Sequence, residues 1–552
     1  MPSTRRVWLL WLALLLAYFA VLGCRPLRMP DEVRYAEISR EMLDSGDWVV
    51  PRLLRLPYFE KPVGGYWLIN TSQLVFGHGN FAVRFPSALA SAITALLVAA
   101  LARSGTGDPR KGWLAGLVYL SSFMVFGVGT DCVLDPMLTM WLTAALGAFW
   151  RAFQTASRGA RWSWWSVFGA LCGAAFLTKG FVALAVPTVA ITPLMLWQRR
   201  WRELLGYGAW SVVVATAVAA PWALSVHARE PDYWRYFFWE EHVRRFASND
   251  AQHPQPFWYF LPFALAMTLP WTGAVPAALR LGWRHGVRAG GPFERLILLA
   301  VLAPLLFFSL AQGKLATYIL PCFPPFAILI GTAIVDGLDR GRSLALQWSA
   351  RLMLGLSSAG LLAVLGLVVF DPSHPDVAGQ TGPVVAVGLL LVMWIGMLAR
   401  TLRRGTGHVA ALALLTPSLA VAMQFTWMHP QVTSRMPQDY VREVVARLPA
   451  DCTLASSSVK LSPLLSWESG RALVVLVGGS GEFTYGLGYP EGRNRHFGFN
   501  TFPAWLAAER RERPVVLFVQ DSVADRPERF PAPDRIERSG SMAVLYYDRR
   551  VG

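Results

Sequence analysis

Residues 112–130, GWLAGLVYLSSFMVFGVGT, form an apolar stretch of 19 residues without a charged side chain. At about 1.5 Å per helical residue, this length crosses the roughly 30 Å hydrocarbon core of a bilayer. Other apolar stretches of comparable length cover residues 7–24, 81–102, 134–153, 163–178, 180–197, 204–227, 257–281, 293–311, 317–336, 345–370, 383–400 and 409–428. The sequence therefore predicts a polytopic α-helical membrane protein with about 13 spanning helices. The stretch 257–281 contains three prolines, so we expect a spanning helix with local kinks there.

The composition supports the same class of protein. Of the 552 residues, 54% are hydrophobic and 16% are charged, whereas soluble domains carry about 25% charged residues. A net charge of +16 would suggest nucleic acid in a soluble protein. Here the arginines lie mostly in short connections between apolar stretches, so we expect membrane lipids as partners and no nucleic acid.

Basic residues mark one side of the membrane. The N-terminus contains Arg5 and Arg6, and every second connection after it is basic. These connections hold Arg103, Arg110 and Lys111; Arg151, Arg158 and Arg161; Arg199, Arg200 and Arg202; Arg280, Arg284, Arg288 and Arg295; Arg340 and Arg342; and Arg400, Arg403 and Arg404. The positive-inside rule makes this side cytoplasmic. With an odd number of spans, the C-terminal tail then lies on the outer side, and we expect 7–24 to be retained as the first helix.

The chain divides into two predicted domains. Residues 1–428 form the membrane domain, with outer loops at 25–80 and 228–256. Within the tail, 429–552, three segments have the composition of short strands, at 472–477, 514–520 and 542–547, and 504–513 has that of a helix. The tail is therefore predicted to be a small α/β domain.

Charged and aromatic residues collect in the outer connections. The segment 30–43 predicts a helix lying at the membrane interface, and 58–62 begins a second such segment. The candidate residues on this side are Asp31, Arg34, Tyr35, Tyr58, Glu60, Lys61, Asp135, Lys179, His242, Arg244, Arg245, Lys314 and Tyr318. Because charges close to a bilayer are costly and usually functional, this concentration on one side predicts a site.

Each candidate also has a structural interpretation. Asp31 could be only a helix N-cap, and Asp135 only the start of a helix. Glu60 and Lys61 could form a solvated pair. Arg244 and Arg245 could hold lipid head groups, and Lys179 could be a snorkelling anchor. Taken singly, most of these residues fit the structural interpretation; taken together on one side, they favour a site.

Six motifs resemble one known family. They are DEVRYAEISREM at 31–42, YFEKP at 58–62, VLDP at 133–136, LTKGF at 177–181, YFFWEEH at 236–242 and GKLATY at 313–318. Together they resemble the bacterial aminoarabinose lipid A transferases, which are relatives of the protein O-mannosyltransferases in the C-type glycosyltransferase class. The similarity runs from the first helix to the tenth span and is weaker in the last three spans and the tail.

The resemblance implies a specific reaction and location. The donor would be undecaprenyl phosphate carrying 4-amino-4-deoxy-L-arabinose, and the acceptor would be a phosphate of lipid A. The enzyme would lie in the bacterial inner membrane, with interfacial helices and the tail domain in the periplasm. The product would carry a cationic sugar that weakens the binding of polymyxin and cationic peptides.

The chemistry of glycosyl transfer from a lipid phosphate predicts roles for the candidate residues. A lipid phosphate leaves as an anion and needs nearby cations, for which Lys61, Arg244 and Arg245 are suited. The sugar carbon passes through an oxocarbenium-like transition state, which a carboxylate can stabilise. We therefore predict catalytic roles for Asp31, Asp135 and Glu60. The predicted substrate-binding residues are Arg34, Tyr35, Tyr58, Lys61, Lys179, Arg244, Arg245, Lys314 and Tyr318.

The sequence leaves open which of the acidic residues stabilises the transition state and which binds the sugar. A lipid A phosphate is already ionised near neutral pH, so it needs little help from a general base. The carboxylates are then available to hold the ammonium group of the sugar. We expect no required cofactor, although Glu60 and His242 could capture zinc as an auxiliary site.

Two other functions are compatible with the sequence. A flippase or transporter of lipid-linked sugars would also be polytopic, but such folds are often built from internal repeats, and none is visible here. An enzyme like the protein O-mannosyltransferases would share the donor chemistry and differ in its acceptor.

Overall fold

The computed structural model describes residues 4–244, 254–341, 344–370, 381–405, 407–426, 436–520 and 529–550. Contacts divide the chain into two compact units, each made of two segments. Unit 1 comprises Met1–Leu22 and Arg84–Thr426, and unit 2 comprises Gly23–Val83 and Trp427–Gly552. The sequence-based division assigned 25–80 to the membrane domain as a loop, whereas the contacts group this segment with the tail.

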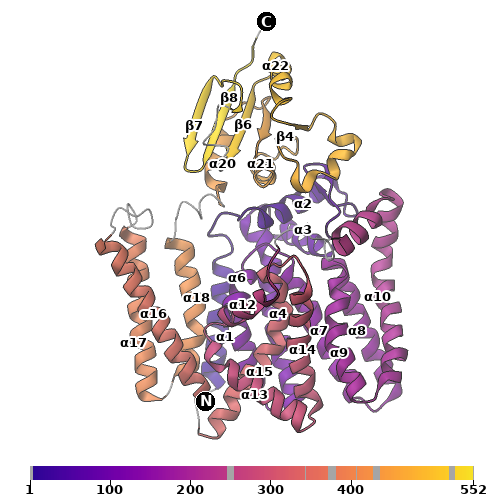
Figure 1. Ribbon diagram of the computed structural model, residues 1–552, viewed down its shortest axis with the longest axis vertical. Coiled ribbons are helices and arrows are strands. Elements are labelled where there is room, and N and C mark those ends of the chain that lie inside the picture. Colours follow the sequence, from indigo (N-terminus) through magenta and orange to yellow (C-terminus); the bar gives the residue numbers. More distant parts are fainter. Residues whose placement is uncertain are drawn as a thin grey trace. The chain divides into compact units, whose positions relative to one another are not determined.

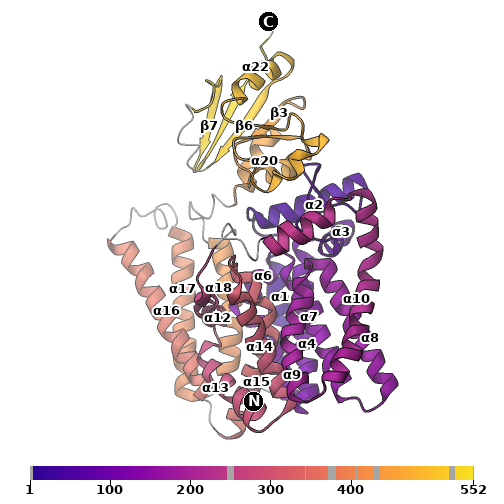
Figure 2. The same ribbon diagram turned by 45° about the vertical axis from the view of Figure 1, so that its right-hand side comes forward.

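Unit 1 is helical throughout its described residues (Figure 1). Its elements are α1 (Thr4–Ala20), α4 (Asn80–Thr106), α5 (Pro109–Ser121), α6 (Phe123–Gly129), α7 (Asp135–Gln154), α8 (Arg158–Lys179), α9 (Val182–Trp197), α10 (Trp201–Arg229), η1 (Arg235–Arg244), η2 (Phe257–Tyr259), α12 (Phe260–Met267), η3 (Thr272–Ala274), α13 (Val275–Leu281), η4 (Gly282–Arg288), α14 (Pro292–Leu310), η5 (Ala316–Cys322), α15 (Phe323–Asp339), α16 (Leu344–Phe370), α17 (Thr381–Arg404) and α18 (His408–Thr426). Each predicted apolar stretch has a helical counterpart among these elements. The long helices α14, α15, α16 and α17 run roughly parallel or antiparallel to one another in Figures 1 and 2.

Six helices in the described part of the chain are long and apolar enough to cross a membrane. The number rises to eight if each of two bent helix pairs is counted as one span. Two shorter apolar helices, Val7–Ala20 and Val182–Trp197, add to the apolar surface. The structure therefore supports a polytopic membrane protein, and the count of about 13 spans stays a prediction.

The stretch 112–130 is two helices and not one. α5 and α6 meet at an angle of 62°, and the residue between them, Ser122, has an extended backbone with ψ near 138°. At this break the backbone N–H of Phe123 lacks a helical partner and donates to the carbonyl of Leu269 at 2.9 Å. A backbone group freed at membrane depth must find such a partner inside the protein.

The stretch 257–281 is also broken. Its two parts, Phe257–Met267 and Thr272–Arg288, are bent by 110°, which is a much larger break than the local kinks that we expected. Pro270 lies within the break and cannot continue a helix, because its nitrogen carries no hydrogen. The two breaks face each other, since Trp271 Nε1 donates to Ser121 Oγ at 3.0 Å.

Unit 2 combines the segment after the first helix with the tail. Its elements are α2 (Asp31–Ser45), β1 (Arg52–Leu53), β2 (Leu56–Pro57), α3 (Gly64–Phe76), α20 (Gln438–Ala446), β3 (Thr453–Ser456), α21 (Ser462–Ser469), β4 (Val474–Val477), η6 (Gly481–Phe483), η7 (Gly486–Gly488), η8 (Pro490–Gly492), β5 (His496–Phe497), α22 (Phe502–Glu512), β6 (Val515–Gln520), β7 (Arg535–Ser539) and β8 (Met542–Tyr547). The three predicted strands are confirmed as β4, β6 and β8, and the predicted helix as α22. The helix predicted over 30–43 is present as α2, with Val33, Ile38 and Met42 buried, and its position at the membrane interface stays a prediction.

The tail contains a six-stranded mixed sheet in the order β5-β4-β3-β6-β8-β7. The first four strands are parallel, and β8 and β7 are antiparallel to their neighbours. Every residue of β6 and β8 is buried, because these central strands are covered on both faces. α22 contributes Phe502 and Leu506 to the core beside Val515, Leu517 and Leu545.

Candidate active site

The predicted site residues fall in both units. Unit 2 holds Asp31, Arg34, Tyr35, Tyr58, Glu60 and Lys61, and unit 1 holds Asp135, Lys179, Lys314 and Tyr318. His242 and Arg244 belong to η1, but their side chains lie outside the described part of the chain, as does the whole of Arg245. Within each unit the structure brings some of these residues into direct contact.

Asp31 is the first residue of α2 and does not cap it. The N-cap position is Pro30, and no side-chain hydrogen bond caps this end of the helix. The Asp31 carboxylate instead forms an ion pair with Arg34, one helical turn further on, while 49% of its side chain remains exposed. The interpretation of Asp31 as only an N-cap is therefore wrong, and its charge is held in place beside solvent.

Arg34 connects Asp31 to the tail. Its guanidinium forms a second ion pair with Glu482 of η6, and Tyr58 Oη donates to the same carboxylate at 3.3 Å. Burial by itself would lower the pKa of the Arg34 guanidinium, but the surrounding hydroxyl and carboxylate groups outweigh it and hold that pKa well above its ordinary value. The guanidinium also lies 5.5 Å from the centre of the Tyr35 ring.

Glu482 was missed in the sequence. It lies 448 positions from Arg34, in a short irregular segment with no motif around it. A single glutamate of this kind carries no local signal of a role. Only the fold of unit 2 brings it to the cluster of Asp31, Arg34 and Tyr58.

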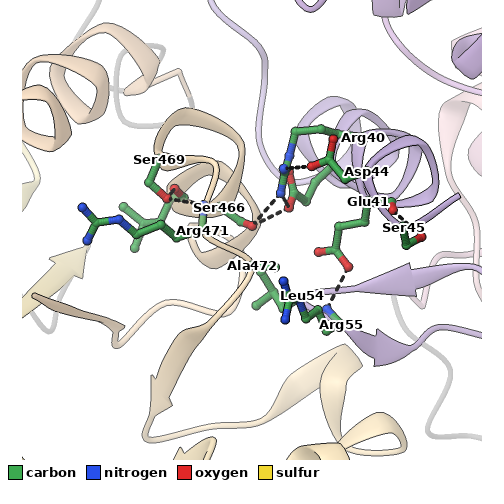
Figure 3. A network of polar contacts seen from close by, with 12 residues as sticks. Arg40, Glu41, Asp44, Ser45, Leu54, Arg55, Ser466, Ser469, Arg471 and Ala472 are labelled. Atoms are coloured by element: carbon green, nitrogen blue, oxygen red, sulfur yellow. Dashed lines mark hydrogen bonds and ion pairs between the residues drawn. The ribbon is translucent and has the colours of Figure 1, made fainter. Parts of the chain in front are cut away.

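A buried polar network holds α2 in its orientation (Figure 3). Arg40 donates to both oxygens of Glu37 at 2.8 and 2.6 Å, and Ser466 of α21 bonds the same carboxylate. Glu41 Oε2 accepts the backbone N–H of Arg55 at 2.8 Å. These bonds tie α2 to α21 and to the turn between β1 and β2, so they fix where Asp31 and Arg34 lie.

The Glu60–Lys61 pair follows β2 in a segment anchored by an aromatic residue. Phe59 is buried and packs its ring against Tyr485 at 5.6 Å and Tyr489 at 6.2 Å. Glu60 and Lys61 are half-buried, and Lys61 Nζ donates to the backbone carbonyl of Glu60 at 2.9 Å. The segment therefore has a fixed base and presents one carboxylate and one ammonium group.

Asp135 and Lys179 form the centre of the cluster in unit 1. Asp135 begins α7, Lys179 ends α8, and their charged groups are 2.7 Å apart with side-chain exposures of 9% and 13%. The Lys179 ammonium lies 5.4 Å from the centre of the Tyr318 ring. Asp135 is thus more than a helix start, and the interpretation of Lys179 as a snorkelling anchor is wrong.

Lys314 was predicted to bind substrate, but its charged group is occupied by contacts within the protein. It is buried, and its ammonium donates to the backbone carbonyls of Gln255 at 2.8 Å and Ala311 at 2.5 Å. These bonds join the segment before η2 to the end of α14. The contacts support a structural role for Lys314, and its role in binding substrate stays a prediction.

The aromatic segment at 235–244 is a π-helix, η1. Phe237 is fully buried and stacks on Phe181 at 5.9 Å and on Tyr233 at 5.4 Å. Its neighbours Phe238 and Trp239 are exposed. One aromatic ring thus anchors η1 next to the end of α8, while the next two remain on the surface.

The described residues contain no group of three or more His, Cys, Asp and Glu side chains arranged to hold a metal ion. The predicted auxiliary pair of Glu60 and His242 cannot be judged from geometry, because the His242 side chain lies outside the described part. That pair therefore stays a prediction.

Two family profiles match the chain. One, described as Dolichyl-phosphate-mannose-protein mannosyltransferase, covers residues 3–237. The other, described as Arabinosyl transferase ArnT, C-terminal domain, covers residues 432–546. Together they cover the segments that carry the clusters of Asp31, Asp135 and Glu482.

Curated relatives match over the full length. The Undecaprenyl phosphate-alpha-4-amino-4-deoxy-L-arabinose arabinosyl transferase of Aeromonas salmonicida (strain A449) is 43% identical over 543 residues, which is 98% of each chain. The protein of the same name from Erwinia tasmaniensis is 42% identical over 557 residues, covering 100% of both chains.

Solved structures show the same fold. The structure of ArnT from Cupriavidus metallidurans bound to undecaprenyl phosphate has a TM-score of 0.83 at 26% identity, covering 99% of this chain and 98% of that one. The apo state of that protein gives a TM-score of 0.81. The fold is that of a polytopic membrane glycosyltransferase of the C-type class, and the chain belongs to the family of the undecaprenyl phosphate-4-amino-4-deoxy-L-arabinose arabinosyl transferases.

Proposed function

We propose that this glycosyltransferase transfers 4-amino-4-deoxy-L-arabinose from undecaprenyl phosphate to a phosphate of lipid A, at the periplasmic face of the bacterial inner membrane. The names of the relatives support the sugar and its carrier, and the related solved structure contains undecaprenyl phosphate. The resemblance of the six motifs supports lipid A as the acceptor.

The reaction exchanges one glycosidic bond for another. The bond between the sugar's anomeric carbon and the carrier phosphate breaks, and undecaprenyl phosphate leaves with the electron pair as an anion. An oxygen of the lipid A phosphate forms the new bond to the same carbon. Cations lower the energy of the departing phosphate, and Lys61, Arg244 and Arg245 are the residues we assign to it.

The position of Asp31 is the observation that carries this proposal. Its carboxylate is half-exposed, caps nothing, and is held by Arg34 at the start of a helix that a buried network fixes. A fixed carboxylate beside solvent suits a sugar carbon that develops positive charge, because pre-oriented charges stabilise a transition state without reorganising. Asp135, held by Lys179, and Glu60 are the further carboxylates to which we assign catalytic roles.

The donor sugar carries an ammonium group, which needs an acceptor. Glu482 presents a carboxylate beside the Tyr58 hydroxyl and the Arg34 guanidinium. We assign this group, with Tyr35 and Tyr58, to the recognition of the sugar. Because the acceptor phosphate is already ionised, the carboxylates are available for binding rather than for removing a proton.

Orientation completes the proposal. By the positive-inside rule, the basic connections support a cytoplasmic N-terminus and a periplasmic unit 2. Transfer there would mask a lipid A phosphate with a cationic sugar and lower the binding of polymyxin and other cationic peptides. The auxiliary zinc pair of Glu60 and His242 is not required in this mechanism.

The test is a reconstituted reaction together with lipid A from cells. Purified protein is incubated in vesicles with the aminoarabinosyl carrier and lipid A, and the products are analysed by mass spectrometry. We expect lipid A that has gained one aminoarabinose, and the same species in cells that make the chain but not in cells that lack it. Movement of the carrier across the vesicle membrane without transfer would show a flippase, and sugar on protein instead of lipid A would show a different acceptor.

A further inference from the structure

A cavity in unit 1 is lined by residues outside the clusters described above. It has a volume of about 290 Å³ and lies where α17 ends and α18 begins, close to the lower end of the volumes of small-ligand sites. Its lining includes Met397, Arg400, Thr401, Arg404, Gly407 and Leu414. None of these residues belongs to the candidate active site.

One wall of the cavity is strongly basic. Arg400 and Arg404 are four positions apart, so they lie on the same face of α17 one turn from each other. Both are exposed, and no acidic side chain in the described part of the chain forms an ion pair with either. Two guanidinium groups without a carboxylate form a site for an anion, and their fork geometry suits phosphate oxygens.

The start of α18 also favours an anion in the cavity. The helix begins at His408, directly after the lining residue Gly407, whose carbonyl accepts the N–H of Ala411 at 3.1 Å. The amide groups of a first helical turn have no partners within the helix, and the dipole there favours negative charge. The start of α18 and the two arginines therefore both favour a negative charge at this cavity.

The remaining wall is apolar and continues along the helices. Met397 and Leu414 line the cavity, and α17 exposes Leu389, Val392 and Met393 along its length. A site with cations at one end, continued by an exposed apolar helix surface, matches an amphiphile with a phosphate head and hydrocarbon chains. Figures 1 and 2 show the α17–α18 connection at the same edge of unit 1 as the N-terminus.

We infer that this cavity binds the head group of an anionic glycerophospholipid, with the phosphate between Arg400, Arg404 and the start of α18, and the acyl chains along α17. The occupant is a lipid of the surrounding membrane and not the sugar donor. It would join the ends of α17 and α18, which are connected by only a few residues.

The test compares matched variants of the purified full-length protein by native mass spectrometry. Phosphatidylglycerol is the probe, and phosphatidylethanolamine, undecaprenyl phosphate and inorganic phosphate are the comparison ligands. The double variant Arg400→Ala/Arg404→Ala should retain phosphatidylglycerol at least about tenfold more weakly, since it removes both guanidinium groups that line the cavity. The control is Arg403→Ala, which removes one positive charge from the same end of α17 at a residue that does not line the cavity, and it should bind as the wild type does.

A second measurement locates the lipid and guards against misfolding. A photoactivatable phosphatidylglycerol should crosslink to peptides covering 397–414 in the wild type and in Arg400→Lys/Arg404→Lys, which keeps both charges. Equal binding by the double alanine variant, crosslinks elsewhere only, or equal binding of phosphatidylethanolamine would overturn the inference. Displacement of the lipid by inorganic phosphate, or preferential binding of undecaprenyl phosphate in this cavity, would overturn the choice of a membrane phospholipid as occupant.

Discussion

Asp31 and Asp135 have corresponding positions in their helices. Each is the first residue of its helix, and each holds a cation through its carboxylate: Arg34 in one case and Lys179 in the other. They differ in exposure, because Asp31 is half-exposed whereas Asp135 is buried. This difference makes Asp31 the more accessible carboxylate for a substrate.

We predict that Asp31→Asn lowers transfer by roughly a hundredfold, because one pre-oriented electrostatic contact contributes on the order of 3 kcal/mol to a transition state. The amide keeps the shape of the side chain and removes its charge. Asp135→Asn should cause a smaller or similar loss. The measurement is the rate of transfer by purified variants, with lipid A mass and polymyxin survival in cells that make each variant at wild-type level.

The matched control is Asp44→Asn in the same helix. Asp44 pairs with Arg40 at the exposed end of α2, where an ion pair contributes at most about 1 kcal/mol to stability. This variant should keep nearly full activity. Full activity of Asp31→Asn would instead remove Asp31 from the mechanism.

Lys61 provides a separate prediction about the carrier. Lys61→Ala should weaken undecaprenyl phosphate binding by about tenfold, since a hydrogen bond to a charged group contributes on the order of 1.5 kcal/mol. Lys460→Ala, an exposed lysine of the same unit, is the control and should not change binding. Unchanged affinity in Lys61→Ala, measured with the folded variant, would show that Lys61 does not contact the phosphate.

Removal of metal should leave the reaction intact. The leaving group is a single phosphate, and basic side chains can neutralise it without an ion. We therefore expect the purified enzyme to keep its transfer rate in EDTA. Activity that disappears on chelation and returns with one added metal would contradict this, and Glu60 and His242 would be the first residues to test.

At the scale of elements, buried charged side chains hold α2 in its orientation. Glu37 and Glu41 lie one turn apart with Arg40 between them, and both carboxyls are buried. Burial, followed by the charge of Glu37, raises the pKa of Glu41 well above its ordinary value of 4.5, although the N–H of Arg55 acts in the opposite direction. The groups that face Glu41 are Glu37 and Arg40 of α2, Arg55 of the β1–β2 turn and Arg495 beside β5.

This environment predicts a pH dependence of stability. Glu41 stays protonated in the folded protein at pH values at which it ionises in the unfolded chain, so the folded state binds more protons. Its contribution to stability is therefore complete below about pH 4.5 and is lost as the pH rises towards the folded pKa. Glu41→Gln mimics the protonated acid, so its melting temperature should fall less steeply with pH than that of the wild type.

The control for this prediction is Glu443→Gln. Glu443 is an exposed residue of α20 that pairs only loosely with Arg447, at 3.6 Å. Its replacement should leave the pH profile of the melting temperature unchanged. Parallel profiles for Glu41→Gln and the wild type would mean that Glu41 is ionised in the folded protein.

At the scale of the whole molecule, each unit is built from segments far apart in the sequence. Unit 2 joins the segment after α1 to the tail, through contacts such as Gln438 with the backbone of Leu27 at 2.6 Å and Arg495 with the carbonyl of Leu54 at 3.2 Å. The segment that carries Asp31 and Lys61 therefore depends on the tail for its structure.

The orientation of the whole molecule gives the last prediction. A reporter enzyme that is active only in the cytoplasm should be inactive when fused after Gly552, because the positive-inside rule predicts that the tail lies outside. The same reporter fused after Gly405, in the basic connection between α17 and α18, should be active. The reverse pattern would invert the orientation and move the proposed site to the cytoplasm.

Much of the fold was available from the sequence because it depends on local patterns. Apolar stretches of membrane length predicted the helices, short runs with strand-like composition predicted β4, β6 and β8, and the motif at 31–42 predicted α2. Hydrophobicity and helix length are properties of neighbouring residues, so one sequence suffices for them. The same holds for the residue types of the site, which the motifs contain directly.

Only the tertiary structure determines which ion-pair partners the charged residues of the site have. The ion pairs of Arg34 with Glu482 and of Lys179 with Asp135 join distant segments, and no local pattern specifies which carboxylate a given cation meets. The breaks after Ser121 and before Trp271 also depend on distant segments, since each supplies a hydrogen-bond partner to the other. The sequence determined which segments are helical and which residues carry charge, and the packing of distant segments determined where helices break and which charges meet.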